Sequence, residues 1–294
     1  MGTLINTFIV LVCCIDWVKR RKFFLVDSIF MSLALVRIFL HWITVVTGVV
    51  RIFYKDVFAS SETLLVLLYL TIFSNNCSIS LASCLIVFYF LKIAHFSHHL
   101  FLWFKRRINK VILMILLGSL IIFLFLNLIL MKEFREDFIG SMKRKEVKNH
   151  TRLFQMESLQ FNVIQSLFYF GHIILLLMSL ISCFLLILSL WRHTRQMQFN
   201  ATGFRDPSTE AHIRVMRWMV SYLFLVILYY LNIFIIRLTS SMLEQRLVDL
   251  LGIVMGGFYP LVHSFILILG NSKLKQASIW MWHQTLLCLQ GGKP

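Results

Sequence analysis

Acidic residues are scarce in this chain, and none of them lies deep inside its long apolar stretches. The 294 residues include 13 Asp and Glu against 29 Lys and Arg, and only three prolines. Proton relays, zinc hydrolysis and intramembrane proteolysis require carboxylates or metal ligands within the membrane. A transporter would show paired ionisable residues, broken helices and inverted repeats. The sequence lacks these features and does not favour an enzyme or a solute carrier.

Cysteine and histidine are too scattered to predict a metal site. No cysteine lies in a segment where an extracellular disulfide is expected; the six are Cys13, Cys14, Cys77, Cys84, Cys183 and Cys288. His41, His172 and His263 belong to three different apolar stretches, with no second ligand at metal-site spacing. Each is interpreted as a hydrogen-bonding residue between helices, and neither a metal nor a cofactor is expected.

Apolar sequence, by contrast, dominates the chain, with 59% hydrophobic residues and a mean hydropathy of +0.81. A helix needs about 20 apolar residues to cross a bilayer. Seven apolar stretches occur, at residues 1–16, 23–50, 57–91, 111–131, 161–190, 218–236 and 247–270. This pattern predicts an all-α membrane protein, a bundle of seven transmembrane helices that forms a single domain over residues 1–294.

The basic residues are concentrated in alternate connecting segments. Segments 17–22, 92–110 and 191–217 and the tail 271–294 hold 17 of the 29 Lys and Arg, whereas the other connecting segments hold 11. Because basic segments stay on the cytoplasmic side, the charge pattern predicts an extracellular N-terminus and a cytoplasmic C-terminus. The expected location of this multi-pass protein is the plasma membrane. No soluble domain is left to bind nucleic acid, so membrane lipid and a cytoplasmic protein are the expected partners.

The first apolar stretch is short. It runs from Met1 to Ile15, before Asp16 and the basic cluster of residues 19–22 mark the inner interface. A signal peptide would carry its positive charges before the apolar run rather than after it. We therefore expect that the sequence lacks the outer half of its first helix, through truncation or a late start codon.

Arg37 is a charged residue inside an apolar stretch. It lies about 10 residues into the second stretch and therefore about 15 Å deep, at about 1.5 Å of rise per residue. A charge at that depth needs partners. Asn6 in the first stretch and Ser264 in the seventh reach a similar depth, and no buried carboxylate is available. We expect Arg37 to bond amide, hydroxyl and carbonyl oxygens and to hold the first, second and seventh helices together.

Several motifs resemble those of the type 2, or bitter, taste receptors, a family of seven-helix G-protein-coupled receptors. They are Ile15–Lys19, Leu33–Ala34 with Arg37, Phe88–Ala94, Lys110–Leu117, Gly203–His212 and His263–Leu274. The resemblance covers essentially the whole chain, and the last motif is long and specific. It implies a receptor, not an enzyme, that binds small bitter organic molecules from outside and activates a gustducin-type G protein. A non-functional truncated remnant and a membrane transporter are the alternatives.

The resemblance also implies a ligand cleft between helices 3, 5, 6 and 7. Asn75 matches the family's pocket asparagine on helix 3, and Tyr229 matches an aromatic pocket position on helix 6. Thr71 stands where many members have tryptophan, and Asn76 where many have histidine, so the identity of the ligand does not follow. The expected ligand contacts are Thr71, Asn75, Asn76, Tyr229 and Ile253.

The inner ends of helices 3 to 7 are expected to meet the G protein, since charge there would govern the encounter of the two proteins. The residues expected at this surface are Tyr89, Lys92, Arg106, Arg107, His212, Arg214 and Lys273.

Glycosylation tests the predicted orientation. Asn149-His150-Thr151 is an acceptor sequence in the long loop of residues 132–160, which is expected outside. Asn200-Ala201-Thr202 also matches but is expected in the cytoplasm. Glycosidase digestion should change the mobility of the wild-type protein and of Asn200→Gln, and should leave Asn149→Gln unchanged. A mobility shift that survives loss of Asn149 and disappears with Asn200 would overturn the orientation.

Overall fold

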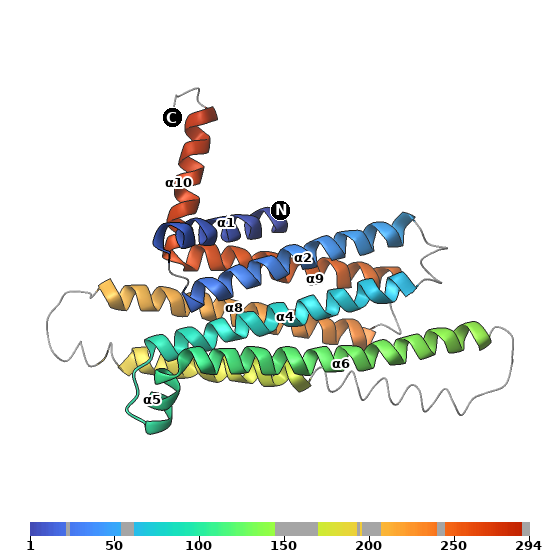
Figure 1. Cartoon of the computed structure of the whole chain (residues 1–294), viewed down its shortest axis with the longest axis horizontal. Helices are drawn as coiled ribbons and strands as arrows, with labels where there is room; N and C mark the ends of the chain where they lie inside the picture. The colour runs from blue at the N-terminus through green and yellow to red at the C-terminus, as the bar shows by residue number, and fades with distance from the viewer. Residues whose placement is uncertain are drawn as a thin grey trace.

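The computed structural model describes residues 1–21, 24–53, 62–144, 170–192, 195, 207–239 and 245–289. All the regular structure in these ranges is helical. The helices are α1 (Gly2–Arg20), α2 (Leu25–Phe53), α4 (Glu62–Ile93), α5 (His99–Arg106), α6 (Ile108–Arg144), the 170–192 helix (Phe170–Arg192), α8 (Pro207–Thr239), α9 (Gln245–Gly270) and α10 (Ser272–Leu289). The long helices run side by side in one bundle, while α5 and α10 cross its axis at one end (Figure 1).

The predicted fold class is confirmed. Five helices among the described residues are long and apolar enough to cross a membrane, and they correspond to predicted stretches one to five. Two shorter apolar segments, Met216–Asn232 in α8 and Gly256–Gly270 in α9, correspond to the sixth and seventh. The chain is therefore an all-α membrane protein with seven apolar helices. Residues 161–169 of the fifth stretch and the acceptor Asn149 lie outside the described residues.

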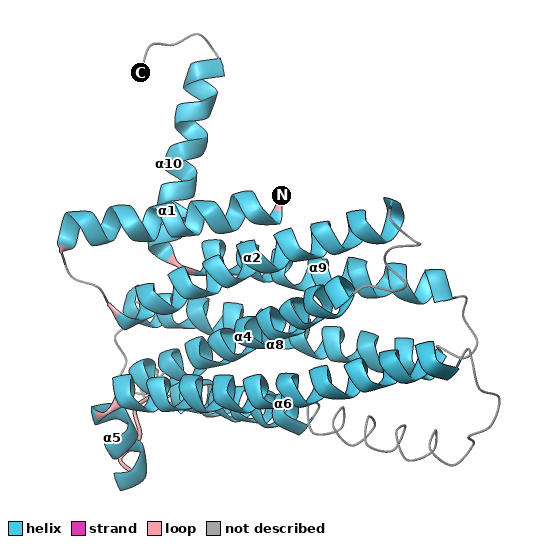
Figure 2. Cartoon of the chain, turned by 45° about the vertical axis from the view of Figure 1, so that its right-hand side comes forward, coloured by secondary structure: helices cyan, strands magenta, loops and turns pink. Residues whose placement is uncertain are grey.

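Helix α4 is the central helix of the bundle. In an apolar stretch of 18 residues within its segment Tyr69–Ile93, 89% of the residues are buried, against 22% to 39% in the corresponding stretches of the other four spanning helices. Figure 2 shows α4 between α2 and α6, and it contacts both. Small side chains such as Ser78, Ala82 and Ser83 are fully buried on α4, and small residues let membrane helices approach closely. The buried polar side chains of α4 therefore face other helices rather than lipid.

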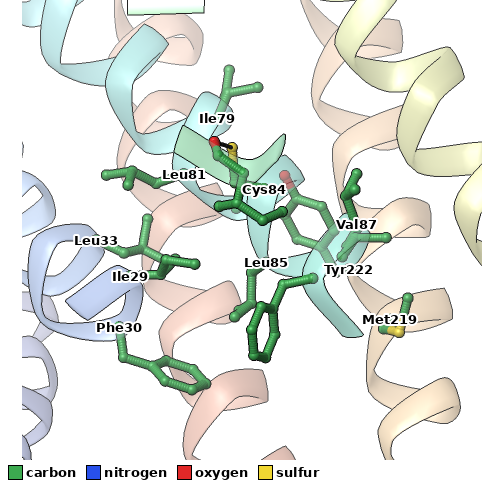
Figure 3. Close-up of a cluster of buried hydrophobic side chains, with 14 of the residues drawn as sticks. Ile29, Phe30, Leu33, Ile79, Leu81, Cys84, Leu85, Val87, Met219 and Tyr222 are labelled. Carbon is green, nitrogen blue, oxygen red and sulfur yellow. Dashed lines mark hydrogen bonds between the residues drawn. The ribbon is translucent and has the colours of Figure 1, made fainter. Parts of the chain in front are cut away.

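Three helices meet in the apolar core drawn in Figure 3. Of the labelled side chains, Ile29, Phe30 and Leu33 come from α2, and Met219 and Tyr222 come from α8. The others come from α4 and are Ile79, Leu81, Cys84, Leu85 and Val87. Cys84 has no exposed surface, and its thiol lies 4.0 Å from the Ile112 carbonyl oxygen on α6. This cysteine therefore fills the packed interior between α4 and α6.

Two helices, α5 and α10, were not predicted from the sequence. Both lie at the same end of the bundle, which we call the basic end (Figure 1). Segment 92–110 was expected only to connect two stretches, yet His98 caps a helix there by accepting a bond from the Leu100 amide at 3.3 Å. The tail beyond Gly270 is helical because the Asn271 side chain accepts bonds from the Lys273 and Leu274 amides. Asparagine is among the best N-terminal capping residues.

Helix α1 continues past its predicted end at residue 16. It ends at Arg20, and Arg21 adopts the left-handed conformation with φ 51°. Arg20 pairs with Asp16 at 2.8 Å, one helical turn earlier. The 19 residues of α1 span about 28 Å at about 1.5 Å per residue. The basic cluster thus begins inside the last turn of the helix.

A close approach of α8 and α9 requires glycine at position 270. A Cβ atom there would lie 2.7 Å from the Trp218 ring, whereas a Cβ at Gly118 would have no neighbour within 4 Å. We expect Gly270→Val to lower the thermal stability of the purified receptor, since overpacking costs about 1–3 kcal/mol. Trp218→Ala should recover part of this loss, and Gly118→Val is the control. Equal melting temperatures for Gly270→Val and Gly118→Val would contradict this packing.

Candidate functional site

The guanidinium of Arg37 is the centre of a buried polar network. Arg37 has no exposed surface. Its Nε donates to Ser78 Oγ on α4 at 3.1 Å, and its Nη1 donates to Ser264 Oγ on α9 at 3.0 Å. Its Nη2 contacts Nδ1 of His263. Because arginine can only donate, His263 Nδ1 must accept, which places the proton of the neutral ring on Nε2.

Ser264 extends the network to α1. Its hydroxyl lies 2.8 Å from Asn6 Oδ1 and 2.9 Å from the Pro260 carbonyl oxygen, and the single hydroxyl proton serves these two acceptors. The Asn6 amide in turn donates to the Gly2 carbonyl at 2.8 Å. The network therefore joins α1, α2, α4 and α9.

The structure brings together the three residues proposed for this network, with one difference in the path. Asn6 is linked to Arg37 through Ser264, and no direct bond between Asn6 and Arg37 occurs. Ser78 and His263 were not proposed as partners of Arg37. His263 was predicted only as a hydrogen-bonding residue between helices. Its position next to Ser264 in the sequence could have identified it as a partner of Arg37. No sequence feature could have identified Ser78, because α4 carries several serines.

Aromatic side chains lead from this network along α8 and α9. The His263 ring lies 4.1 Å from the Tyr222 ring, centroid to centroid. The Tyr259 hydroxyl donates to the Tyr222 hydroxyl at 3.3 Å, and the Tyr259 ring lies 5.0 Å from the Tyr229 ring. The sequence spacing could have indicated these contacts, because residues four or seven apart share one face of a helix. Tyr222 and Tyr229 are seven residues apart on one helix, and Tyr259 and His263 are four apart on another.

The structure brings together two of the expected ligand residues. Asn75 Nδ2 on α4 donates to the Tyr229 hydroxyl on α8 at 3.0 Å. Thr71 is half-buried, and its hydroxyl donates to the Leu67 carbonyl of its own helix at 2.8 Å. Asn76 faces another direction, where its Oδ1 meets His172 Nε2 at 2.9 Å. The side chain of Ile253 lies outside the described residues.

His172 and Tyr230 are two further polar residues of this region that the sequence did not single out as a site. Their rings lie 5.7 Å apart. Neither Asn76 Nδ2 nor the Tyr230 hydroxyl has a hydrogen-bond partner among the residues that the structure describes. The side chains around the His172 and Tyr230 rings leave no room for a water molecule; they are Ile79, Ser83, Leu176, Ser179, Tyr222, Leu223 and Val226.

A mostly apolar cavity of about 40 Å³ lies at the basic end. It is lined by Phe30, Leu85, Ile86, Tyr89, Trp218, Met219, Ile266, Leu267, Gly270 and Asn271. Of the residues expected at the G-protein surface, Tyr89 lines this cavity, and Lys92 is exposed near it with its ammonium 5.5 Å from the Phe88 ring. Arg106 and Arg107 are exposed on or next to α5, away from the lining. The side chains of His212 and Arg214 lie outside the described residues.

Lys273 is held by two carboxylates at the base of α10. Its Nζ lies 2.7 Å from Asp16 Oδ2 and 3.1 Å from Asp27 Oδ1. Burial acts to lower the pKa of Lys273, but the hydrogen bonds to Asp16 and Asp27 outweigh it and raise the pKa above its usual value. This side chain therefore ties α10 to α1 and α2, a structural role that the sequence did not predict.

The fold and the network define a class of protein. Seven apolar helices enclose a buried cation on α2 that is held by neutral partners on α4 and α9, and a mostly apolar cavity lies at the basic end. Among the described residues, no group of three or more His, Cys, Asp or Glu is placed to hold a metal ion. The molecule is a polytopic α-helical membrane protein with its polar groups gathered between the helices.

Sequence comparison then gives the family. A family model described as "Taste receptor protein (TAS2R)" matches residues 1–285. Taste receptor type 2 member 7 of Papio hamadryas is 42% identical over 296 residues, covering 100% of this chain and 92% of the relative. Member 10 of Papio hamadryas is 43% identical over 289 residues, covering 98% and 91%. Member 7 of Rattus norvegicus is 40% identical over 293 residues, covering 100% and 94%. The chain belongs to the type 2, or bitter, taste receptor family of G-protein-coupled receptors.

Arg37→Ala should reduce surface expression or signalling, because it leaves Ser78, Ser264 and His263 without their shared donor. Such losses in membranes are modest, on the order of 1 kcal/mol per interaction, so partial function is expected. Thr44→Ala is the matched control, since Thr44 lies on the same helix and its hydroxyl bonds only the Leu40 carbonyl of that helix at 2.8 Å. Surface labelling and concentration–response curves are the measurements. Wild-type trafficking and potency in Arg37→Ala would count against the network.

Proposed function

We propose that the chain is a bitter taste receptor that binds small organic compounds from the extracellular side and activates a heterotrimeric G protein of the gustducin class. Membership of the taste receptor family supports this function. The structural observation that carries it is the bond between Asn75 on α4 and Tyr229 on α8. This pair stands at one end of the aromatic path that reaches the Arg37 network.

The ligand site is proposed at Asn75 and Tyr229, with Thr71 beside them one turn earlier on α4. Asn75 offers a donor and an acceptor, and Tyr229 offers a ring with a polar tip. An agonist that hydrogen-bonds Asn75 would compete with the present bond to Tyr229. It would therefore release the tyrosine from α4. The preferred ligands are small and mostly apolar, with one or two hydrogen-bonding groups, as is usual for concave helix-bundle sites.

Movement of α8 is the proposed route from ligand to G protein. Tyr229, Tyr222 and Trp218 lie along α8, and Trp218 lines the cavity at the basic end. An agonist that favours an outward position of α8 would widen this cavity, because a ligand shifts a conformational equilibrium only through its differential affinity for the two states. The mostly apolar lining, which includes Tyr89, suits the C-terminal helix of a G-protein α subunit, and Lys92 adds positive charge beside it.

The proposed orientation follows from charge, and the proposed cellular location follows from the receptor function. The basic end is assigned to the cytoplasm and the N-terminus to the outside, because Lys and Arg concentrate in the segments at that end. The plasma membrane is the location in which a receptor for external compounds would act.

Mutation of the ligand site tests the function. In cells that carry a chimeric G protein, a panel of bitter compounds should include at least one agonist. Asn75→Ala and Tyr229→Ala should weaken the response to that agonist, and Thr71→Trp should exclude bulkier agonists selectively. Concentration–response curves on receptors matched for surface expression provide the measurement.

Ser221→Ala is the control for this series. Ser221 lies on α8 like Tyr229, but its hydroxyl bonds only the Arg217 carbonyl one turn earlier at 2.9 Å. The Ser221→Ala receptor should therefore respond to the agonist as the wild type does. If all three site variants match wild type across several agonists, the ligand binds elsewhere. If no compound in the panel triggers nucleotide exchange by the surface-expressed wild-type receptor, the proposed function itself is contradicted.

A further inference from the structure

Helix α5 carries an apolar face whose side chains are exposed. Leu100, Trp103 and Phe104 are 64%, 49% and 40% exposed. At about 100° per residue these three side chains share one side of the helix. Lys105 and Arg106 lie on the other side, with Leu102, which is 37% exposed, between them. A helix with a strong apolar face and a basic face is typical of segments that lie in the membrane interface.

The apolar face is held outward by contacts on the neighbouring side of α5. The Phe101 ring packs edge-on against Phe90 and Phe96, with centroids 5.5 Å and 5.3 Å away. The Lys105 ammonium donates to the Ala94 carbonyl at 2.8 Å. These contacts fix the rotation of α5 about its own axis. Exposure of Leu100 and Phe104 therefore follows from the fold.

The place of α5 in the chain sets its level along the bundle. Residues 94–98 link it to the end of α4, and Arg107 alone separates it from α6. Since both neighbouring helices contain membrane-spanning segments, these short links keep α5 within a few residues of the bilayer surface. It runs transverse to the long helices there (Figure 1), as a helix lying in the plane of the interface would.

Charge indicates which surface α5 meets. The sequence has no Asp or Glu between Glu62 and Glu133, while Lys105, Arg106, Arg107 and Lys110 fall within six positions of each other along the chain. The guanidinium of Arg107 lies over the Trp103 ring at 5.2 Å. The cation and the indole therefore lie at a similar depth relative to the membrane surface. Basic groups beside an interfacial tryptophan match anionic phospholipid headgroups above acyl chains.

We propose that α5 is an interfacial anchor that binds anionic phospholipid. Leu100, Trp103 and Phe104 insert at the boundary of headgroups and acyl chains, and Arg106 and Arg107 bind headgroup phosphates. The anchor holds the link between α4 and α6 against the leaflet and so fixes one flank of the basic end. This assignment rests on the membrane fold and does not depend on which ligand or G protein the receptor recognises.

Depth measurement by spin labelling tests the anchor on the full-length protein. Cys14→Ser and Cys288→Ser remove the two cysteines that are not buried. Single labels are then placed by Leu100→Cys, Phe104→Cys and, as the control on the polar side of the same helix, His99→Cys. In nanodiscs of phosphatidylcholine and phosphatidylserine, the first two labels should collide severalfold more with oxygen than with a water-soluble nickel chelate, and the His99→Cys label should show the opposite preference.

Three outcomes would overturn the proposal. The first is equal access of the chelate to all three labels, which would place the apolar face in water. The second is protection of the Leu100→Cys and Phe104→Cys labels only after a G protein is added, which would make the face a protein-docking surface. The third is that the Leu100→Cys and Phe104→Cys labels are buried equally in nanodiscs of phosphatidylcholine alone and in the Arg106→Gln, Arg107→Gln double variant. This result would show that anionic headgroups have no role. A working agonist response in any of these cases leaves the proposed function untouched.

Discussion

The buried positive charge of Arg37 is the constraint on which the rest of the bundle depends. A charge deep in a membrane helix is costly unless its donors are matched. Its described hydrogen-bond partners, Ser78, Ser264 and His263, are neutral and come from α4 and α9. Asn6 joins them through Ser264. Since each bond fixes the depth and rotation of a helix, the network sets the register of α1, α2, α4 and α9.

The Arg37 network also connects to a row of aromatic rings that can transmit movement from one helix to another. The rings of His263, Tyr222, Tyr259 and Tyr229 contact one another in sequence from the network to Asn75. They belong alternately to α9 and α8, so a shift of one helix relative to the other changes several contacts together. Helix α4 is anchored at Ser78 and packed almost completely, which makes α8 the helix with more freedom to move.

The sequence predicted the parts of this account that depend on composition and depth. The seven apolar stretches could be read directly, whereas helices such as α6 and α8 extend beyond the predicted limits. Depth alone related Arg37 to Asn6 and Ser264. The sequence could not select Ser78 among the many serines of α4, because that choice depends on helix rotation. It also missed α5 and α10, whose helices start at the capping side chains of His98 and Asn271, and the pairing of Lys273 with Asp16 and Asp27, which only the packing of α10 brings together.

A thermodynamic cycle on the purified receptor tests the central claim most directly. Ser78 and Ser264 lie on different helices and are linked through the Arg37 guanidinium. Their alanine variants should therefore be non-additive in thermal stability, with a coupling energy of about 0.6 kcal/mol, typical of membrane hydrogen bonds. The same pair should become additive in an Arg37→Met background. Additive effects with arginine present, or coupling that persists without it, would contradict the claim that Arg37 sets the arrangement of these helices.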